Sequence, residues 1–262
     1  MDNIVAKKSL GQNFLHDKNI IEKIVTSNNV TDKDLIIEIG PGKGALTKEL
    51  KRFNSQIICY EIDERMRPVL KELENDKVKV IYGDFLKRDI VSDLKDLSFN
   101  NLYVIGNLPY YITTPIIEKV IDSGIDLTAM TIMVQKEVAD RFTAKPRSKE
   151  YNSLTIYLNY YFDVEKLFIV KNTCFNPIPK VDSAVVKFSK KENKYLVNNE
   201  KHFFKLVNDS FKFKRKTLKN NLNGYNWDTI KKVLEEENYK ESVRAEEISI
   251  ETFVNISNKL SN

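Results

Sequence analysis

The sequence predicts an α/β protein with a Rossmann-like sheet, helices on both faces of that sheet, and a small all-helical domain at the C-terminal end. Short apolar runs such as residues 35–40 and 102–106 alternate with helical patterns along the first 189 residues. This alternation is typical of a mostly parallel sheet. From His202 onward the apolar residues recur only at helical spacing. We therefore expect one domain over residues 1–189 and a second over residues 190–262.

The individual elements follow from local signals. Asp17 is expected to cap a helix whose apolar side includes Ile20 and Ile24, and Thr114 with Pro115 is expected to start the helix after the fourth strand. Periodicity leaves residues 153–162 open between helix and strand, and we favour helix. Residues 190–200 are polar and predict a linker. The expected strands are residues 35–40, 56–63, 78–84, 102–106, 129–134, 166–170 and 181–188.

The composition excludes several kinds of protein. Two cysteines cannot form a disulfide framework or a zinc site, and two histidines make His-centred catalysis and His-rich metal sites poor hypotheses. We expect no metal. No apolar run approaches the roughly 18 residues of a membrane span, and the first ten residues lack the apolar core of a secretory signal. These observations favour a monomer of the reducing cytoplasm, with no membrane partner.

The positive charge is concentrated in one part of the chain. The net charge is only +5, but residues 191–220 hold nine Lys and Arg against three acids, a local net of +6. Residues 221–262 hold five bases and eight acids, a net of −3. A local excess of this kind fits a phosphate-binding patch. The alternative is a lysine-rich helix face that is simply solvated.

Three features at successive strand ends indicate a cofactor that carries adenosine. The glycine-rich turn GPGKG, residues 40–44, lets a ligand approach the backbone at a helix N-terminus. Glu61 follows about 20 residues after the first glycine, where a carboxylate can bind both ribose hydroxyls. Asp84 ends the third strand, where it can accept from an adenine amine. Acids at strand ends are also common loop residues, so the argument depends on the three features together.

The fourth strand runs into the sequence NLPYY, residues 107–111, which suits the handling of a planar amine. The carbonyl oxygens of the Asn107 side chain and of Leu108 can accept hydrogen bonds from an exocyclic NH2, Pro109 fixes the turn, and Tyr110 offers a stacking face. A nicotinamide dehydrogenase would share the glycine turn, but the sequence offers no evident acid/base pair for a carbonyl substrate. NLPY favours methylation of an aromatic amine by S-adenosylmethionine.

The wider set of motifs resembles the KsgA-type (RsmA) ribosomal RNA adenine dimethyltransferases, nearly end to end and in order. This resemblance implies a class I S-adenosylmethionine-dependent methyltransferase sheet and a helical RNA-binding C-terminal domain. The matching segments are SLGQNFLHD (9–17), EIGPGKGALT (38–47), GNLPYYITTPII (106–117), FNPIPKVDSAVV (175–186), FKFKRKTLKNNL (211–222) and VRAEEISIETFVNISNKL (243–260).

The resemblance also implies roles for single residues. Asn107, Leu108, Pro109 and Tyr110 would grip the target adenine, and Phe175 would stack on its other face, with core packing as the alternative for Phe175. The implied substrate is a pair of adjacent adenosines in the 3′-terminal hairpin loop of small-subunit (16S) rRNA, within a pre-30S or 30S particle. The residues that match the family's S-adenosylmethionine contacts are Asn13, Leu15, Gly40, Glu61, Asp84 and Asn107.

With RNA as substrate, the Lys and Arg residues of the basic segment become candidates for phosphate contacts. Phe211 and Phe213 are interleaved with these Lys and Arg residues, and we expect both rings to anchor their segment to its domain rather than to stack on RNA. One departure from the family pattern is Asn152, where glycine is usual, and asparagine tolerates a left-handed backbone. The candidate RNA-binding residues are Lys145, Arg147, Lys149, Lys212, Lys214, Arg215, Lys216 and Lys219.

Two other functions stay open beside the main hypothesis. Erm-type enzymes methylate an adenine of large-subunit (23S) rRNA and share the N-[LI]-P-Y core, although the residues after Tyr110 fit the KsgA type better. A non-catalytic RNA-binding factor on the same fold is the second alternative. The intact Asn107 and Tyr110 argue against that factor.

Overall fold

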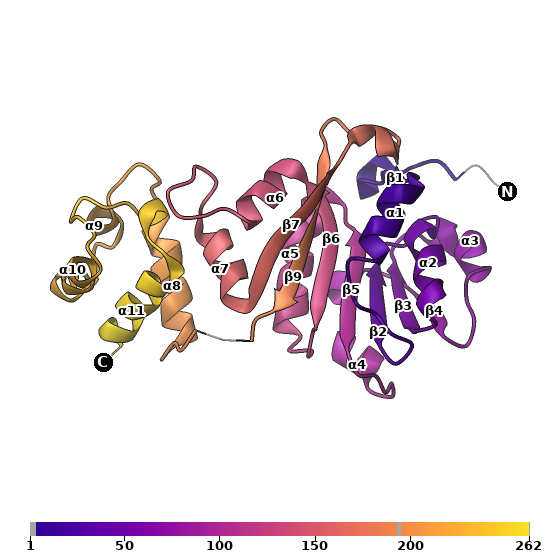
Figure 1. Cartoon of the computed structure of the whole chain (residues 1–262), viewed down its shortest axis with the longest axis horizontal. Coiled ribbons are helices and arrows are strands. Elements are labelled where there is room, and N and C mark those ends of the chain that lie inside the picture. Colours follow the sequence, from indigo (N-terminus) through magenta and orange to yellow (C-terminus); the bar gives the residue numbers. More distant parts are fainter. Residues whose placement is uncertain (1–3, 193–194, 262) are drawn as a thin grey trace. The chain divides into compact units, whose positions relative to one another are not determined.

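Between residues 35 and 190, seven strands form one sheet (Figure 1). The computed structural model describes residues 4–192 and 195–261, so residues 193 and 194 of the expected linker lie outside the described residues. The sheet has the order β4-β3-β2-β5-β6-β9-β7, and β1 and β8 form a separate two-stranded pair. The strands are β1 Phe14–Leu15, β2 Leu35–Ile39, β3 Gln56–Glu61, β4 Val78–Tyr82, β5 Leu102–Asn107, β6 Ala129–Gln135, β7 Phe162–Val170, β8 Phe175–Asn176 and β9 Ser183–Lys190.

The strand order creates a crevice at one end of the sheet. The chain runs outward from β2 through β3 to β4 and then returns to the other side of β2 as β5, with all of these pairs parallel. β5 and β6 are also parallel, whereas β6 and β9 are antiparallel. The order therefore reverses between β2 and β5. In open α/β sheets, ligands bind at the carboxyl ends of the strands that flank such a reversal.

Both faces of the sheet are covered, as the unbroken apolar strands predict. Ile36 of β2 packs in a cluster with Ile24 of α1 and Leu50 of α2. Its neighbours Leu35 and Ile37 are equally buried and point to the opposite face, because successive side chains of a strand alternate. The predicted fold class is therefore confirmed.

The helices begin close to where the sequence predicts them, with one difference. Asp17 caps α1 by accepting from Ile20 N, as expected, and residues 153–161 are helical. Thr114 is not the cap of α5, because a 3-10 turn over Tyr110–Ile112 leads straight into the helix and moves its start to Thr113. The helices are α1 Lys18–Val25, α2 Ala45–Leu50, α3 Arg67–Lys71, α4 Ile90–Leu94, α5 Thr113–Asp122, α6 Lys136–Phe142, α7 Ser153–Tyr161, α8 Glu200–Ser210, α9 Leu218–Asn221, α10 Trp227–Glu236 and α11 Ile250–Leu260.

The chain separates into two compact units. The first comprises Met1–Ala139 and Glu165–Lys190, and the second Asp140–Val164 and Lys191–Asn262. The change at residue 190 lies next to the expected boundary, but residues 140–164 group with the C-terminal helices. The reason is that Ile156 and Tyr160 of α7 belong to the same apolar cluster as Phe203 of α8 and Phe253 of α11.

The second unit is helical, as expected, and its apolar positions face one another in that cluster. None of the helices within residues 4–192 and 195–261 has the length and apolar character needed to cross a membrane.

Candidate active site

A cavity of about 320 Å³ lies at the carboxyl ends of β2, β3 and β5. It is lined by residues 10–16, by the glycine loop with the start of α2, by Glu61 and Ile62, by residues 107–110 and by Asn176. The structure thus brings together most of the predicted pocket residues, from four separate stretches of chain. These are Asn13, Leu15, Gly40, Glu61, Asn107, Leu108, Pro109 and Tyr110.

The glycine loop needs its glycines for two different reasons. Gly40 has φ of +70° and Gly42 has φ of +55°. Residues with a side chain are strained in this region of the backbone, whereas glycine is not. A Cβ on Gly40 would meet no protein atom within 4 Å, so open space is kept beside a residue of the cavity lining. A Cβ on Gly42 would lie 3.1 Å from the ring of Phe14. The first glycine therefore leaves room for a ligand, and the second lets the N-terminal part of the chain pack against the loop.

Glu61 is held in one orientation by backbone amides. Its Oε2 accepts from Gly42 N at 2.9 Å and its Oε1 accepts from Asp63 N at 2.7 Å. The residue is 3% exposed, and burial raises the pKa of its carboxyl group. Each oxygen keeps a second lone pair. A fixed carboxylate of this kind, on the cavity lining beside the glycine loop, fits the two hydroxyls of a ribose.

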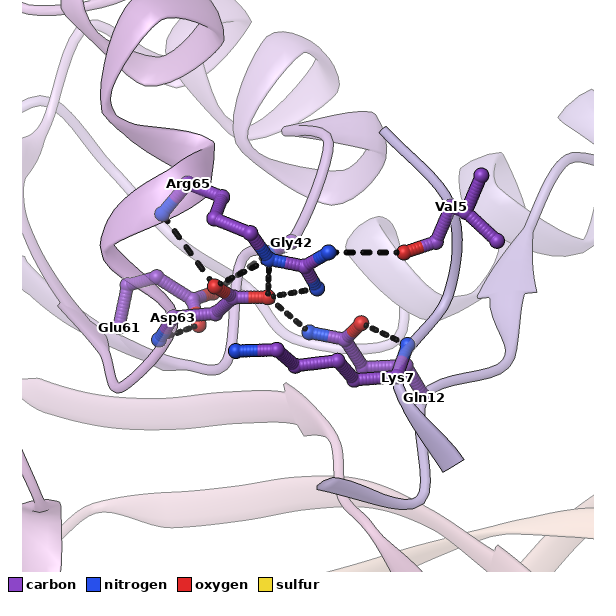
Figure 2. Close-up of polar contacts among 7 residues, drawn as sticks. All are labelled: Val5, Lys7, Gln12, Gly42, Glu61, Asp63 and Arg65. Carbon is purple, nitrogen blue, oxygen red and sulfur yellow. Dashed lines mark hydrogen bonds and ion pairs between the residues drawn. The ribbon is translucent and has the colours of Figure 1, made fainter. Parts of the chain in front are cut away.

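The N-terminal segment, residues 7–16, is tied to the end of β3 by a network of polar contacts (Figure 2). Gln12 donates from Nε2 to Asp63 Oδ2 at 2.9 Å and accepts from Lys7 N at 2.8 Å. Arg65 pairs with the same Asp63 carboxylate at 2.6 Å and donates to the carbonyl of Val5 at 3.2 Å. The Arg65 guanidinium holds the pKa of the Asp63 carboxyl well below its usual range. Sequence reasoning missed Gln12 and Asp63, because contacts between positions 51 residues apart leave no local pattern.

Two further contacts hold the N-terminal segment against the rest of the cavity lining. The ammonium of Lys43 lies 4.9 Å from the centre of the Phe14 ring. β1 pairs with β8, with Leu15 opposite Phe175. The N-terminal segment is therefore a fixed wall of the cavity, held by the ends of β3 and β5, the glycine loop and β8.

The contact at β5 also orients Asn107. Its Nδ2 donates to the carbonyl of Asn13 at 2.9 Å, so its Oδ1 is the side-chain atom left to accept from a ligand. The Tyr110 hydroxyl lies 3.0 Å from Ser183 Oγ, which fixes the ring. Burial raises the pKa of Tyr110, so its hydroxyl stays protonated at neutral pH. An oriented carbonyl oxygen and an aromatic face thus stand at one edge of the cavity.

This arrangement suits transfer of a methyl group to an aromatic amine. S-adenosylmethionine, when bound, supplies an electrophilic methyl group. The amine is a poor nucleophile because its lone pair is delocalised into the ring. Acceptors at Asn107 Oδ1 and the Leu108 carbonyl can hold its two N–H bonds and direct the lone pair out of the ring plane. Positioning and electrostatics supply the catalysis, and no strong base is required.

Two predicted pocket residues do not line the cavity. Asp84 accepts from Leu86 N at 3.0 Å and starts the 3-10 turn Phe85–Lys87, with Lys87 Nζ 4.0 Å away. Phe175 is 1% exposed and packs in the apolar cluster of the sheet. It offers no face to an adenine in this structure, and the geometry favours the core-packing alternative. Its pairing with Leu15 draws the ring inward, which the motif alone could not indicate.

A buried carboxyl group links the two elements that flank the glycine loop. Glu38 of β2 is 1% exposed and accepts from Thr47 Oγ1 of α2 at 2.6 Å. This bond closes across the loop that joins β2 to α2. Burial raises the pKa of Glu38 to about 7. The signal in the sequence is a single acid inside the apolar strand LIIEIG.

In the second unit, the two predicted basic segments meet. Lys214 Nζ donates to the carbonyl of Lys149 at 2.7 Å, and Arg147 N donates to the carbonyl of Glu246 at 2.7 Å. Lys219 also pairs with Glu241 at 2.8 Å. All of the predicted RNA-binding side chains are exposed, namely Lys145, Arg147, Lys149, Lys212, Lys214, Arg215, Lys216 and Lys219.

Two details in this region differ from expectation. Asn152 has an extended backbone and caps α7, accepting from Leu154 N and Thr155 N, while Arg147 takes the left-handed conformation with φ of +72°. Phe211 anchors its segment as predicted, with its ring 6.0 Å from the rings of Tyr151 and Phe253. Phe213 does not, because its side chain is 49% exposed.

The fold, the glycine loop and the oriented Asn107 define the chain as a methyltransferase that uses S-adenosylmethionine. Within the described residues, no group of three or more His, Cys, Asp or Glu is arranged to hold a metal ion. Comparisons with known proteins extend the identification. The family model described as ribosomal RNA adenine dimethylase matches residues 3–262. The chain therefore belongs to the ribosomal RNA adenine dimethylase family.

Individual relatives agree with this family. The chain is 43% identical to ribosomal RNA small subunit methyltransferase A of Enterococcus faecalis, over 97% of this chain and 90% of the relative. It is 44% identical to the protein of the same name from Aster yellows witches'-broom phytoplasma, over 97% and 95%. A dimethyladenosine transferase from Plasmodium falciparum superposes with a TM-score of 0.77 at 26% identity, over 93% and 95% of the two chains. The 23S rRNA methyltransferase ErmE superposes with a TM-score of 0.74 at 23% identity, over 95% and 100%, which shows the shared fold.

Proposed function

We propose that this enzyme dimethylates the N6 amines of two adjacent adenosines in the 3′-terminal hairpin loop of small-subunit rRNA. It acts as a monomer in the cytoplasm, on a pre-30S or 30S particle. The observation that carries the proposal is the bond from Asn107 Nδ2 to the Asn13 carbonyl, which presents Asn107 Oδ1 as an acceptor beside the Tyr110 ring. The names of the bacterial relatives support the small subunit as the source of the adenine.

Each cavity residue receives a role in this proposal. Asn13, Leu15 and Gly40 form the surface that S-adenosylmethionine contacts, and Glu61 binds its ribose. Asn107, Leu108, Pro109 and Tyr110 hold the adenine, with Asn107 also touching the cofactor. We assign no ligand contact to Asp84 or Phe175 in this conformation, since neither lines the cavity.

The predicted basic residues of segments 145–149 and 212–219 bind rRNA phosphates in this proposal. The bond between Lys214 and Lys149 supports one continuous basic surface instead of two separate ones. Structured RNA is recognised largely through its shape and its backbone. A basic surface fixed by backbone contacts suits that kind of recognition.

The first experiment supplies labelled S-adenosylmethionine with unmethylated small subunits and, separately, with protein-free large-subunit rRNA. The methylated nucleosides are then resolved by mass. Dimethyladenosine at two neighbouring positions of small-subunit rRNA is the expected result. Label on a single adenine of large-subunit rRNA would replace the proposal with the Erm-type function. Bound cofactor without transfer to either RNA would indicate a binding factor on this fold.

A further inference from the structure

Residues 211–217 form the turn between α8 and α9. This turn exposes one of its two aromatic side chains and packs the other. Phe211 contacts the apolar cluster of the second unit, whereas Phe213, two positions later, keeps 49% of its side chain in solvent. An apolar core is thus within reach of this turn, and Phe213 is directed away from it. Single exposed apolar residues are common in proteins, so exposure alone does not indicate a site.

The backbone of Phe213 is clamped by an asparagine side chain. Asn221 of α9 accepts from Phe213 N at 2.9 Å through Oδ1 and donates to the Phe213 carbonyl at 3.1 Å through Nδ2. Lys216 N donates to the same carbonyl at 2.9 Å. Both polar backbone groups of Phe213 are therefore fixed. The turn presents the ring at a defined position.

Positive charge surrounds the presented ring. The ammonium of Lys216 lies 4.5 Å from the ring centre and that of Lys212 lies 5.9 Å from it. Arg215 is exposed on the same turn, and Lys214 connects the turn to the loop of residues 145–149. An aromatic face among cations is complementary to a nucleobase and its flanking phosphates, because the base can stack while the phosphates pair with the ammonium groups. A lysine over the ring can swing to a phosphate on its flexible stem when a base takes the face.

We propose that Phe213 is a stacking platform for an unpaired base of the RNA substrate, with Lys212 and Lys216 binding the phosphates beside that base. This inference rests on the proposed function, since it takes RNA as the substrate. It goes further by naming an aromatic contact in the second unit, outside the methyl-transfer cavity. It also gives the basic turn a preference for unpaired RNA over duplex.

The test uses the full chain and two synthetic RNAs of equal length, a hairpin with an unpaired loop and a blunt duplex. Binding is measured by fluorescence anisotropy at several salt concentrations. We expect Phe213→Ala to weaken hairpin binding about tenfold, because one stacked base contributes roughly this much. The dependence on salt should keep its slope, since no phosphate contact is lost. Duplex binding should be unchanged.

Three further variants make the result specific. Phe213→Trp should retain hairpin affinity, and Phe213→Leu should behave as Phe213→Ala, since leucine is apolar but cannot stack. Leu196→Ala, which removes an 86% exposed apolar side chain from the same unit, is the matched control and should bind as the wild type does. Circular dichroism and thermal unfolding verify that each variant is folded.

Several outcomes would overturn the inference. Wild-type hairpin affinity in both Phe213→Ala and Phe213→Leu would do so, as would an equal loss on hairpin and duplex. If Phe213→Ala instead lost binding to vesicles of phosphatidylcholine and phosphatidylserine while binding RNA normally, the turn would be a membrane contact. A wild-type enzyme that makes dimethyladenosine on small subunits keeps the proposed function even when Phe213 proves dispensable. Absence of transfer by the wild type would defeat the proposed function separately.

Discussion

The cavity of the first unit and the basic turn of the second unit, the two binding regions of the proposed function, differ in their burial and in how their side chains are held. In the cavity, Glu61 is 3% exposed and accepts two backbone hydrogen bonds. On the turn, Phe213 and its lysine neighbours are exposed, and the hydrogen bonds from Asn221 hold the backbone of Phe213 but not its ring. Burial makes every polar contact of the cavity strong and specific. Because the turn is exposed, its charge contacts are screened by salt. Such contacts also tolerate RNAs of different sequence.

This difference indicates that methyl transfer and RNA recognition are carried out by different units of this enzyme. In the proposed function, selectivity for an amine depends on a few atoms around Asn107, whereas affinity for a large RNA is spread over many side chains of the second unit. Changes in the cavity should therefore alter turnover steeply. Changes on the turn should alter RNA affinity in a salt-dependent manner while the chemical step persists.

The steepest effect is expected for Asn107→Ala. This change removes the oriented acceptor and the bond to the Asn13 carbonyl, so kcat for methyl transfer should fall at least about 100-fold. Single-turnover transfer from labelled S-adenosylmethionine measures it, with circular dichroism to verify the fold. Asn100→Ala, an exposed asparagine that precedes β5, is the matched control. Turnover within about twofold of the wild type in Asn107→Ala would remove this residue from the mechanism.

Removal of three charges from the turn should weaken RNA binding on the order of a hundredfold at 0.1 M salt. The triple variant Lys214→Ala, Arg215→Ala and Lys216→Ala should also flatten the plot of log affinity against log salt, because fewer counterions are released. The control removes the same net charge elsewhere in the second unit, at Lys232, Lys240 and Lys259, and should keep the wild-type slope. Equal slopes in both triple variants would place the turn off the RNA path.

The buried carboxyl group of Glu38 predicts a pH-dependent stability of the first unit. Its pKa is raised by burial to about 7, from an ordinary value of 4.5. Between these values the folded protein keeps a proton that the unfolded chain has lost, so the free energy of unfolding falls as pH rises from about 5 to above 7. Glu38→Gln should flatten this profile by on the order of 3 kcal/mol.

Urea unfolding at pH 5 and pH 8 measures the effect of Glu38. Gln at this position keeps an oxygen for the Thr47 hydroxyl and removes the titration. Glu64→Gln makes the same change at an exposed position and should keep the wild-type profile. A difference between the two pH values that survives in Glu38→Gln would assign the dependence to other groups.

The smallest effect is expected for Gln12→Ala, which unties the N-terminal segment from Asp63 and from Lys7 N. Two hydrogen bonds of about 1 kcal/mol each predict a rise of up to about 30-fold in the Kd for S-adenosylmethionine. The kcat at saturating cofactor should change less, because Asn107 keeps its own contact with the segment. Isothermal titration calorimetry measures the Kd. Gln56→Ala, at the opposite end of β3, is the control, and equal Kd values in the two variants would show that the tie does not shape the cavity.

The sequence predicted the parts of the molecule that rest on local rules. The strands, the glycine loop and the Asn107 turn follow from apolar runs, from glycines and from strand ends. The first five strands of the large sheet lie within about two residues of the predicted bounds, whereas β7 starts four residues earlier than predicted and β9 is shifted by two. The residues of the cavity come together because the carboxyl ends of parallel strands lie at the same edge of the sheet. These features need no knowledge of distant contacts.

The differences between expectation and structure concern side chains whose surroundings are set by distant residues. Phe175 is buried because β8 pairs with Leu15, some 160 positions earlier. Phe213 is exposed because Asn221 clamps its backbone away from the cluster that holds Phe211. Residues 140–164 join the second unit through the buried side of α7. In each example the local pattern was compatible with either environment, and tertiary packing decided between them.

The pairing of β1 with β8 has a consequence for the order in which the protein matures. Chains emerge from the ribosome N-terminus first, so the segment that walls the cofactor cavity is among the first parts made. Its partner strand ends at Asn176, and the pair cannot close before that residue has been synthesised. Contacts this far apart in sequence form late. The wall of the cavity that depends on this pair therefore cannot be complete until the chain has been synthesised through Asn176.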